Sequence, residues 1–207
     1  MFTKEDRWSN ILESYYNEEY EDSLYESKIF FEELKINPDD FYIWKAKFQM
    51  VLCLKKIGKI KQAMNCAKSS LQYAISVSEK TKVFWILGSC YENINKQQSL
   101  KYYKKAIINS KYLKLDGYVY TLEFNVAKLN HDFNKMNKAV SLLEGISKNN
   151  EINLSLLNDT YKELFSMYIA NNRYRDAMLI IRKVTNKLIK TYMVTTIQQS
   201  KVVSICN

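Results

Sequence analysis

The sequence has little glycine and proline, with four glycines and one proline among 207 residues. Sheet-rich folds need such turn residues about every ten positions, so their scarcity argues against β-sandwiches and barrels. The glycines also stand singly, at positions 58, 88, 117 and 145, which excludes a glycine-rich loop around a phosphate. With 47% hydrophobic and 26% charged residues, the composition favours a folded, all-α protein.

Residues that carry catalysis or bind metals are also scarce. The cysteines at 53, 66, 90 and 206 are far apart and form no C-x-x-C pair, so we expect reduced thiols rather than a disulfide framework or a zinc site. The single histidine, His131, has no H-E-x-x-H motif around it and no nucleophile elbow nearby. We therefore expect no catalytic residue, no metal and no cofactor, and a protein that is not an enzyme.

The chain begins without the apolar core of a signal peptide. No apolar run approaches the roughly 18 residues that span a bilayer. These absences predict an intracellular, cytoplasmic protein without membrane insertion.

The formal net charge of +9 is unevenly distributed. Residues 1–40 hold 12 acidic and 4 basic residues, whereas residues 41–207 hold 10 acidic and 27 basic ones. The acidic run at residues 18–22 is interpreted as a solvated helix face. A strongly basic body thus follows an acidic amino-terminal segment.

An internal repeat organises the chain. Its clearest copy places large residues on a first helix and a small one on a second helix, in the order Tyr161, Leu164, Phe165, Tyr168, Ala177, Ile181 and Val184. The large side chains fill the core of a helical hairpin, and the small alanine lets the two backbones approach closely. This copy resembles the tetratricopeptide (TPR) pattern W-x2-L-G-x2-Y…A-x3-F…A.

Three further copies align with this one. The second copy contains Phe84, Leu87, Gly88, Tyr91, Ser99, Tyr103 and Ala106, and its connecting turn is one residue shorter than the family spacing. The third copy contains Met50, Val51, Leu54, Gly58, Ala63, Ala67 and Ser70. The fourth copy contains Val126, Ala127, Asn130, Ala139, Leu143 and Ile146. Their small crossing residues are Ala63, Ser99, Ala139 and Ala177. The separations exceed the roughly 34 residues of the standard repeat, so the repeats are elongated and similar to those of bacterial peptide-pheromone receptors.

This resemblance implies a right-handed superhelix, or solenoid, of about five antiparallel helix hairpins. We expect one domain over residues 1–207, with an acidic first hairpin at 1–40, basic repeats at 41–190 and a C-terminal capping helix or tail at 191–207. The helix pairs are predicted at 4–17 and 20–36, 40–57 and 59–77, 79–94 and 97–111, 116–131 and 134–147, and 153–170 and 173–190. Asn37, Ser78, Asp116 and Asn150 are predicted to start helices. Val194, Ile197, Val202 and Ile205 are predicted to cover the final hairpin.

The resemblance also implies that the first helix of each hairpin lines a concave groove for a peptide or protein. The candidate groove residues are Lys82, Trp85, Ser89, Phe124, Asn125, Lys128, Lys162 and Ser166. Lysines pair with acidic side chains or a terminal carboxylate, and Trp85 or Phe124 buries an apolar anchor. Core packing explains Trp85 equally well, and solvent exposure explains the lysines. The Lys-x3-Asn spacing of chaperone-binding repeats survives only as Lys45-x3-Gln49 and Lys162-x3-Ser166.

These features favour a non-enzymatic adaptor or scaffold that binds an acidic or C-terminal peptide segment. The alternative is a nucleic-acid-associated subunit of a larger complex, using the basic ridge formed by Lys101, Lys104, Lys105, Lys111 and Lys114. The acidic segment at 13–33 suggests a further hypothesis, self-association with the basic face of a second copy.

Overall fold

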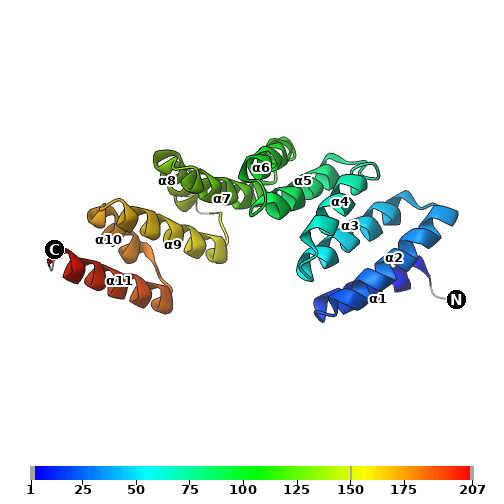
Figure 1. Ribbon diagram of the computed structural model, residues 1–207, viewed down its shortest axis with the longest axis horizontal. Helices are drawn as coiled ribbons and strands as arrows, with labels where there is room; N and C mark the ends of the chain where they lie inside the picture. The colour runs from blue at the N-terminus through cyan, green and yellow to red at the C-terminus, as the bar shows by residue number, and fades with distance from the viewer. Residues whose placement is uncertain (1–2, 150, 206–207) are drawn as a thin grey trace. The chain divides into compact units, whose positions relative to one another are not determined.

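The computed structural model describes the backbone of residues 3–149 and 151–205, and side chains through residue 198. This part of the chain contains α-helices and no strand (Figure 1). The helices are α1 (Lys4–Tyr16), α2 (Tyr20–Ile36), α3 (Asp40–Lys56), α4 (Ile60–Ser70), α5 (Val77–Tyr91), α6 (Lys96–Tyr112), α7 (Asp116–Asp132), α8 (Met136–Ser147), α9 (Leu154–Ala170), α10 (Tyr174–Lys183) and α11 (Lys187–Ile205). The predicted all-α, TPR-like fold class is confirmed.

The helices fall into two compact units. Unit 1 is Met1–Leu113 and holds α1 to α6, and unit 2 is Lys114–Asn207 and holds α7 to α11. Within each unit, consecutive helices pack on one another as hairpins stacked in series (Figure 1). The interpretation of residues 1–207 as one repeat domain stays a prediction.

Four of the turns inside hairpins share one backbone geometry. A residue with positive φ follows the first helix, namely Glu18 (67°), Gly58 (77°), Asn134 (57°) or Asn172 (57°). The next amide donates to a carbonyl five residues earlier, as Lys59 N does to Leu54 O at 2.9 Å and Arg173 N to Tyr168 O at 2.8 Å. Such a turn satisfies carbonyls that the helix end leaves free, so it stops each first helix at the equivalent place.

The turn between α5 and α6 differs from the other four. Its Asn95 N donates to Tyr91 O at 2.8 Å, and its Asn95 Oδ1 accepts from Gln98 N at 3.0 Å as the N-cap of α6. Here the backbone of Asn95 satisfies a carbonyl at the end of α5, and its side chain caps the start of α6, without a left-handed residue. This is the copy whose turn is one residue short in the sequence.

Small residues lie at the helix crossings, as the repeat pattern predicts. Ala63, Ser99, Ala139 and Ala177 are each fully buried. In unit 1, Gly88 lies against the ring of the fully buried Tyr103, and Ser99 Oγ donates to Gly88 O at 2.7 Å. A larger side chain at Gly88 or Ser99 would separate α5 from α6.

The core of unit 2 contains the clearest copy of the repeat. Its signature residues from Tyr161 to Val184 are all buried, together with Leu143 and Ile146 of α8. Tyr168 Oη donates to Glu144 Oε1 at 2.6 Å, which satisfies the polar end of a buried ring. Burial and this bond both raise the pKa of the Tyr168 phenol.

The last predicted helix boundary is wrong. Instead of running to residue 190, α10 ends at Lys183, and α11 begins at Lys187. Asn186 Oδ1 starts the new helix by accepting from Leu188 N at 3.1 Å and Ile189 N at 3.2 Å. The capping helix thus begins four residues before the predicted residue 191, and its Met193 and Ile197 are buried.

Other details of the helix map also differ. Val194, predicted to cover the last hairpin, is 39% exposed, and the side chains of Val202 and Ile205 lie outside the described residues. In unit 1, α4 ends at Ser70 rather than near 77. Its successor α5 starts from a capping box between Ser76 and Glu79 instead of at Ser78. The N-cap of α3 is Asp39 instead of Asn37, and α7 begins at Asp116 as predicted. The N-cap of α9 is Asn153, while Asn150 lies outside the described residues.

Candidate functional site

The candidate residues of unit 1 lie on one face of α5. Lys82, Trp85 and Ser89 are three and four positions apart, so they follow one another along the helix, and all three are half-buried. The ammonium of Lys82 lies 5.7 Å from the centre of the Trp44 ring on α3. Farther along, Lys55 Nζ of α3 donates to Ser89 Oγ at 2.7 Å. The side chains of α3 therefore share this face with those of α5.

Sequence reasoning missed Lys45 as a member of this face. Its ammonium lies 3.4 Å from the ring centre of Phe41, 5.4 Å from that of Tyr42 and 5.8 Å from that of Trp8 on α1. Burial among these groups lowers the pKa of Lys45, and the charge of Lys82 lowers it further. The available signal was the Phe41-x3-Lys45 spacing, which puts a ring one helical turn before the lysine.

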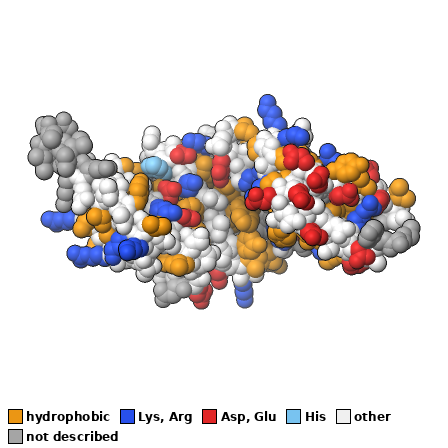
Figure 2. All heavy atoms as spheres, turned by 90° about the horizontal axis from the view of Figure 1, so that it is seen from below, with side chains coloured by type: hydrophobic (Ala, Val, Ile, Leu, Met, Phe, Trp, Pro, Cys, Tyr) orange, Lys and Arg blue, Asp and Glu red, His pale blue; other side chains and the backbone are white. Residues whose placement is uncertain are grey.

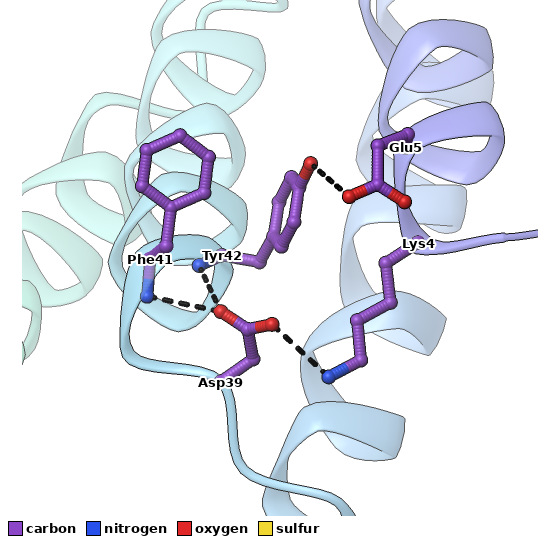
Figure 3. Close-up of polar contacts among 5 residues, drawn as sticks. All are labelled: Lys4, Glu5, Asp39, Phe41 and Tyr42. Atoms are coloured by element: carbon purple, nitrogen blue, oxygen red, sulfur yellow. Dashed lines mark hydrogen bonds and ion pairs between the residues drawn. The ribbon is translucent and has the colours of Figure 1, made fainter.

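A contact between α1 and α3 fixes the start of α3 (Figure 3). Asp39 Oδ1 caps α3 by accepting from Phe41 N at 3.1 Å and Tyr42 N at 3.3 Å, and its Oδ2 lies 3.1 Å from Lys4 Nζ. The hydrogen bond from Lys4 is the largest cause that lowers the pKa of Asp39. Tyr42 Oη donates to Glu5 Oε1 at 3.3 Å. These bonds orient the rings that surround Lys45.

In unit 2 the candidates divide between α7 and α9, two helices that contact each other. Phe124 packs against the core of this unit, and the exposed Lys128 lies 5.9 Å from its ring centre. Asn125 is half-buried on the same helix. On α9, Lys162 and Ser166 are exposed, and Lys162 pairs with Asp159 at 3.2 Å. Their role in binding stays a prediction.

The chaperone-type spacing does not form an amide and lysine pair at either place. Gln49 is 4% exposed, and its Nε2 faces Ser23 Oγ at 3.5 Å and Cys53 Sγ at 3.7 Å inside the hairpin core. Its amide is therefore turned away from solvent. At the other place, the partner of Lys162 is Asp159 of its own helix.

The thiols of the described chain are unpaired with one another, and its potential metal ligands do not cluster. Cys53, Cys66 and Cys90 are free, and burial raises the pKa of each thiol. No three His, Cys, Asp or Glu side chains of the described residues gather as a metal site would require. Among the same residues, no helix has the length and apolar character needed to cross a bilayer.

The basic ridge on α6 is solvent-exposed at Lys101, Lys104, Lys105 and Lys111. The ammonium of Lys105 lies 5.2 Å from the ring centre of Phe84 and 5.8 Å from that of Tyr102. The Tyr102 ring in turn stacks on Tyr91, with centres 5.6 Å apart. These rings already have partners within the unit.

Stacked hairpins, small residues at the crossings and recurring left-handed turns define a TPR-like helical repeat protein. No family model matches the sequence, and neither does any curated protein. The repeat that the residue pattern predicts is therefore confirmed by the fold and its structural neighbours.

Solved structures with this fold include two Rap proteins. The apo form of RapI has a TM-score of 0.74 at 13% identity, over 92% of this chain and 56% of that chain. BtubC (BKLC) from P. vanneervenii has a TM-score of 0.73 at 11% identity, over 94% and 80%. A Rap protein complexed with Competence and Sporulation Factor has a TM-score of 0.65 at 11% identity, over 87% and 52%. This chain thus spans little more than half of either Rap protein.

Proposed function

We propose that this chain is a non-enzymatic adaptor that binds a peptide or protein segment of acidic character on the first helices of its hairpins. The observation that carries the proposal is the pairing of lysines with partly exposed aromatic rings on these helices. Lys82 and Trp85 are neighbours on α5, and Lys128 lies 5.9 Å from the Phe124 ring on α7. The Rap protein solved with its factor supports a binding role for the fold.

Such pairs suit a segment that carries both a carboxylate and an apolar side chain. The ring supplies apolar area that an anchoring residue buries, and the adjacent ammonium makes a charge-assisted hydrogen bond. The amide of Asn125 both donates and accepts, which suits the backbone of an extended peptide. Repeat scaffolds bind partners on extended surfaces of this kind.

The test compares Trp85→Ala and Lys128→Ala with Lys101→Ala, which removes an exposed lysine from the basic ridge. Each tagged protein captures partners from lysate of the native cell at fixed salt, and the captured proteins are quantified by mass spectrometry. We expect one partner to fall about tenfold with either of the first two variants, as for a hot-spot residue, and to be retained by Lys101→Ala. Equal capture by all variants would show that these helices do not carry binding.

A second candidate is nucleic-acid association through the exposed lysines of α6. Lysine-rich ridges bind phosphate backbones with an affinity that falls steeply with salt. A gel shift with a single-stranded oligonucleotide, repeated from low to physiological salt, tests this candidate. Loss of the shift by physiological salt would eliminate specific nucleic-acid binding.

Self-association is a third proposal, based on the acidic end of unit 1. Asp and Glu side chains gather over this end in Figure 2. Within the described residues, those around the α1–α2 turn have no ion-pair partner: Glu13, Glu18, Glu19, Glu21, Asp22 and Glu26. Opposite charge on a second copy would steer an encounter. Light scattering at low and high salt tests this, and a monomer at every salt concentration contradicts it.

A further inference from the structure

The face shared by α1, α3 and α5 holds two lysines among aromatic side chains. Lys45 contacts the rings of Phe41, Tyr42 and Trp8, and Lys82 lies over Trp44. Both lysines are half-buried. A ring face attracts an ammonium group and limits the positions that its flexible stem samples. The two charges are therefore held in place rather than spread through solvent.

The two lysines are also close enough that their charges interact. The charge of Lys82 contributes to the lowered pKa of Lys45, after burial as the larger cause. Like charges in a partly desolvated place repel more strongly than they do in water. An anion between them would relieve this repulsion. It would also stabilise the ammonium of Lys45, which burial has partly deprived of water.

No carboxylate of the described residues supplies that anion. Neither Lys45 nor Lys82 forms an ion pair in this part of the chain. Residues 41–113 contain 14 lysines and, as acids, only Glu79 and Glu92. Glu79 closes the capping box of α5, and Glu92 accepts from Tyr103 Oη. The carboxylate has to come from elsewhere.

The nearby acids of α1 and of the α2–α3 turn are also engaged. Glu5 accepts from Tyr42, and Asp39 caps α3 while it pairs with Lys4 (Figure 3). Their bonds hold the rings of the face, so moving either carboxylate toward Lys45 would break the contact that positions them. The positive face is a built feature of the fold.

The surroundings of the two lysines favour a carboxylate on a peptide over a nucleic acid. Bases bind proteins by stacking on open ring faces. The rings of Phe41, Trp8 and Trp44 already carry an ammonium. Tyr42 and Trp44 are buried, whereas Phe41 is 60% exposed and offers apolar surface beside Lys45. That combination suits an acidic side chain next to an apolar one.

We propose that Lys45 and Lys82 form an anion-binding subsite on the first-helix face of unit 1, which takes a Glu or Asp side chain of a partner peptide beside an apolar residue. The subsite deepens the proposed adaptor function and rests on it. It adds Lys45, Phe41 and Trp8 to the residues that the repeat pattern selects.

The test titrates the full chain into a fluorescein-labelled peptide, acetyl-Gly-Leu-Glu-Glu-Leu-Gly-amide, followed by anisotropy at fixed salt. The variants Lys45→Met and Lys82→Met keep the apolar stem and remove the charge, and Lys61→Met is the matched control at an exposed lysine of α4. We expect Kd to rise at least tenfold with either subsite variant and less than twofold with the control. Circular dichroism melts check that the variants are folded.

Two further probes identify the chemistry. A Gln-for-Glu version of the peptide should lose at least tenfold in affinity, and the same Gln peptide with a free C-terminal carboxylate should not recover it. Three results would overturn the subsite: undetectable binding of the acidic peptide at millimolar protein, equal binding of the Gln peptide, or equal loss with Lys61→Met. An oligothymidylate that binds through the same two lysines would reassign the face to nucleic acid.

The outcomes also separate the subsite from the adaptor function. If Trp85→Ala and Lys128→Ala weaken capture of the native partner while Lys45→Met and Lys82→Met leave it unchanged, the adaptor function stands and the subsite fails. If the peptide depends on both subsite lysines while Trp85→Ala and Lys128→Ala change nothing, the subsite stands and the adaptor function proposed through Trp85 and Lys128 fails.

Discussion

Replacing Gly88 by Ala tests the close approach of α5 and α6. A Cβ at this position would lie 2.6 Å from Cδ1 and 2.7 Å from Cε1 of Tyr103. The Tyr103 ring is fully buried, and its hydroxyl is held by Glu92. The ring therefore cannot turn away without losing packing or a hydrogen bond.

Two opposing contributions set the expected change. Alanine is favoured over glycine inside a helix by roughly 0.5–1 kcal/mol, whereas overpacking a core costs about 1–3 kcal/mol. We expect Gly88→Ala to lower the free energy of unfolding by about 1–2 kcal/mol. Gly145→Ala is the matched control, since it is also helical and its Cβ would meet nothing within 4 Å. It should raise stability by roughly 0.5–1 kcal/mol.

The assay is thermal unfolding by circular dichroism, in which 1 kcal/mol corresponds to about 2–4 °C for a chain of this size. A double-mutant cycle with Tyr103→Leu adds a second measurement. Removing the ring should cost less in the Gly88→Ala background, with a coupling of about 0.5–3 kcal/mol. If Gly88→Ala melts at or above the wild-type temperature, the close crossing is not a constraint on this hairpin.

Three further predictions concern buried hydroxyls, a cap and a turn. Ser99→Ala should lower the free energy of unfolding in urea by about 1 kcal/mol because the serine hydroxyl donates to Gly88 O. The control Ser110→Ala should be neutral or stabilising because the buried Ser110 hydroxyl has no partner among the described residues. Equal losses of stability would contradict the reasoning. Asp39→Asn should lower the free energy of unfolding at neutral pH, because the pKa of Asp39 is lowered and its ionised carboxylate stabilises the fold. The difference from wild type should shrink as pH falls below the ordinary carboxyl pKa of 3.8 and Asp39 becomes protonated. A difference that persists in acid would refute this linkage. Glu18→Gly should raise the free energy of unfolding in urea by about 0.5–1 kcal/mol, since φ at this position is 67° and glycine adopts it without strain. A loss of stability would show that contacts of the glutamate side chain outweigh its backbone strain.

Most of the fold could be predicted from the sequence because the repeat constrains the same positions in each copy. Residues such as Ala63 and Ala177 are small where two helices cross, and no loop or surface residue needs that periodicity. Helix ends were harder to predict. Asn186 interrupts what reads as one continuous amphipathic stretch, and only its side-chain bonds to Leu188 N and Ile189 N distinguish a cap from a helical asparagine.

For the candidate site, the sequence predicts which helices carry the residues but not which side chains contact one another. Family spacing places Lys82 and Trp85 on the exposed face of α5, but it carries no information on contacts between hairpins. The sequence marks Lys45 only by its spacing to Gln49, and its place in the candidate site follows from the contacts with Trp8 of α1 and the charge of Lys82 of α5. Gln49 shows the opposite case, in which a plausible surface amide turns inward to Ser23 and Cys53.

The placement of tryptophan has an experimental consequence. Trp8, Trp44 and Trp85 lie on α1, α3 and α5, so all three belong to unit 1, and unit 2 contains only tyrosine and phenylalanine as aromatic residues. Indole emission excited at about 295 nm therefore reports on unit 1 alone, while far-ultraviolet dichroism averages over both units. Coincident melting curves would mean that the hairpins unfold as one cooperative array, and separated curves would give each unit its own stability from a single unlabelled sample.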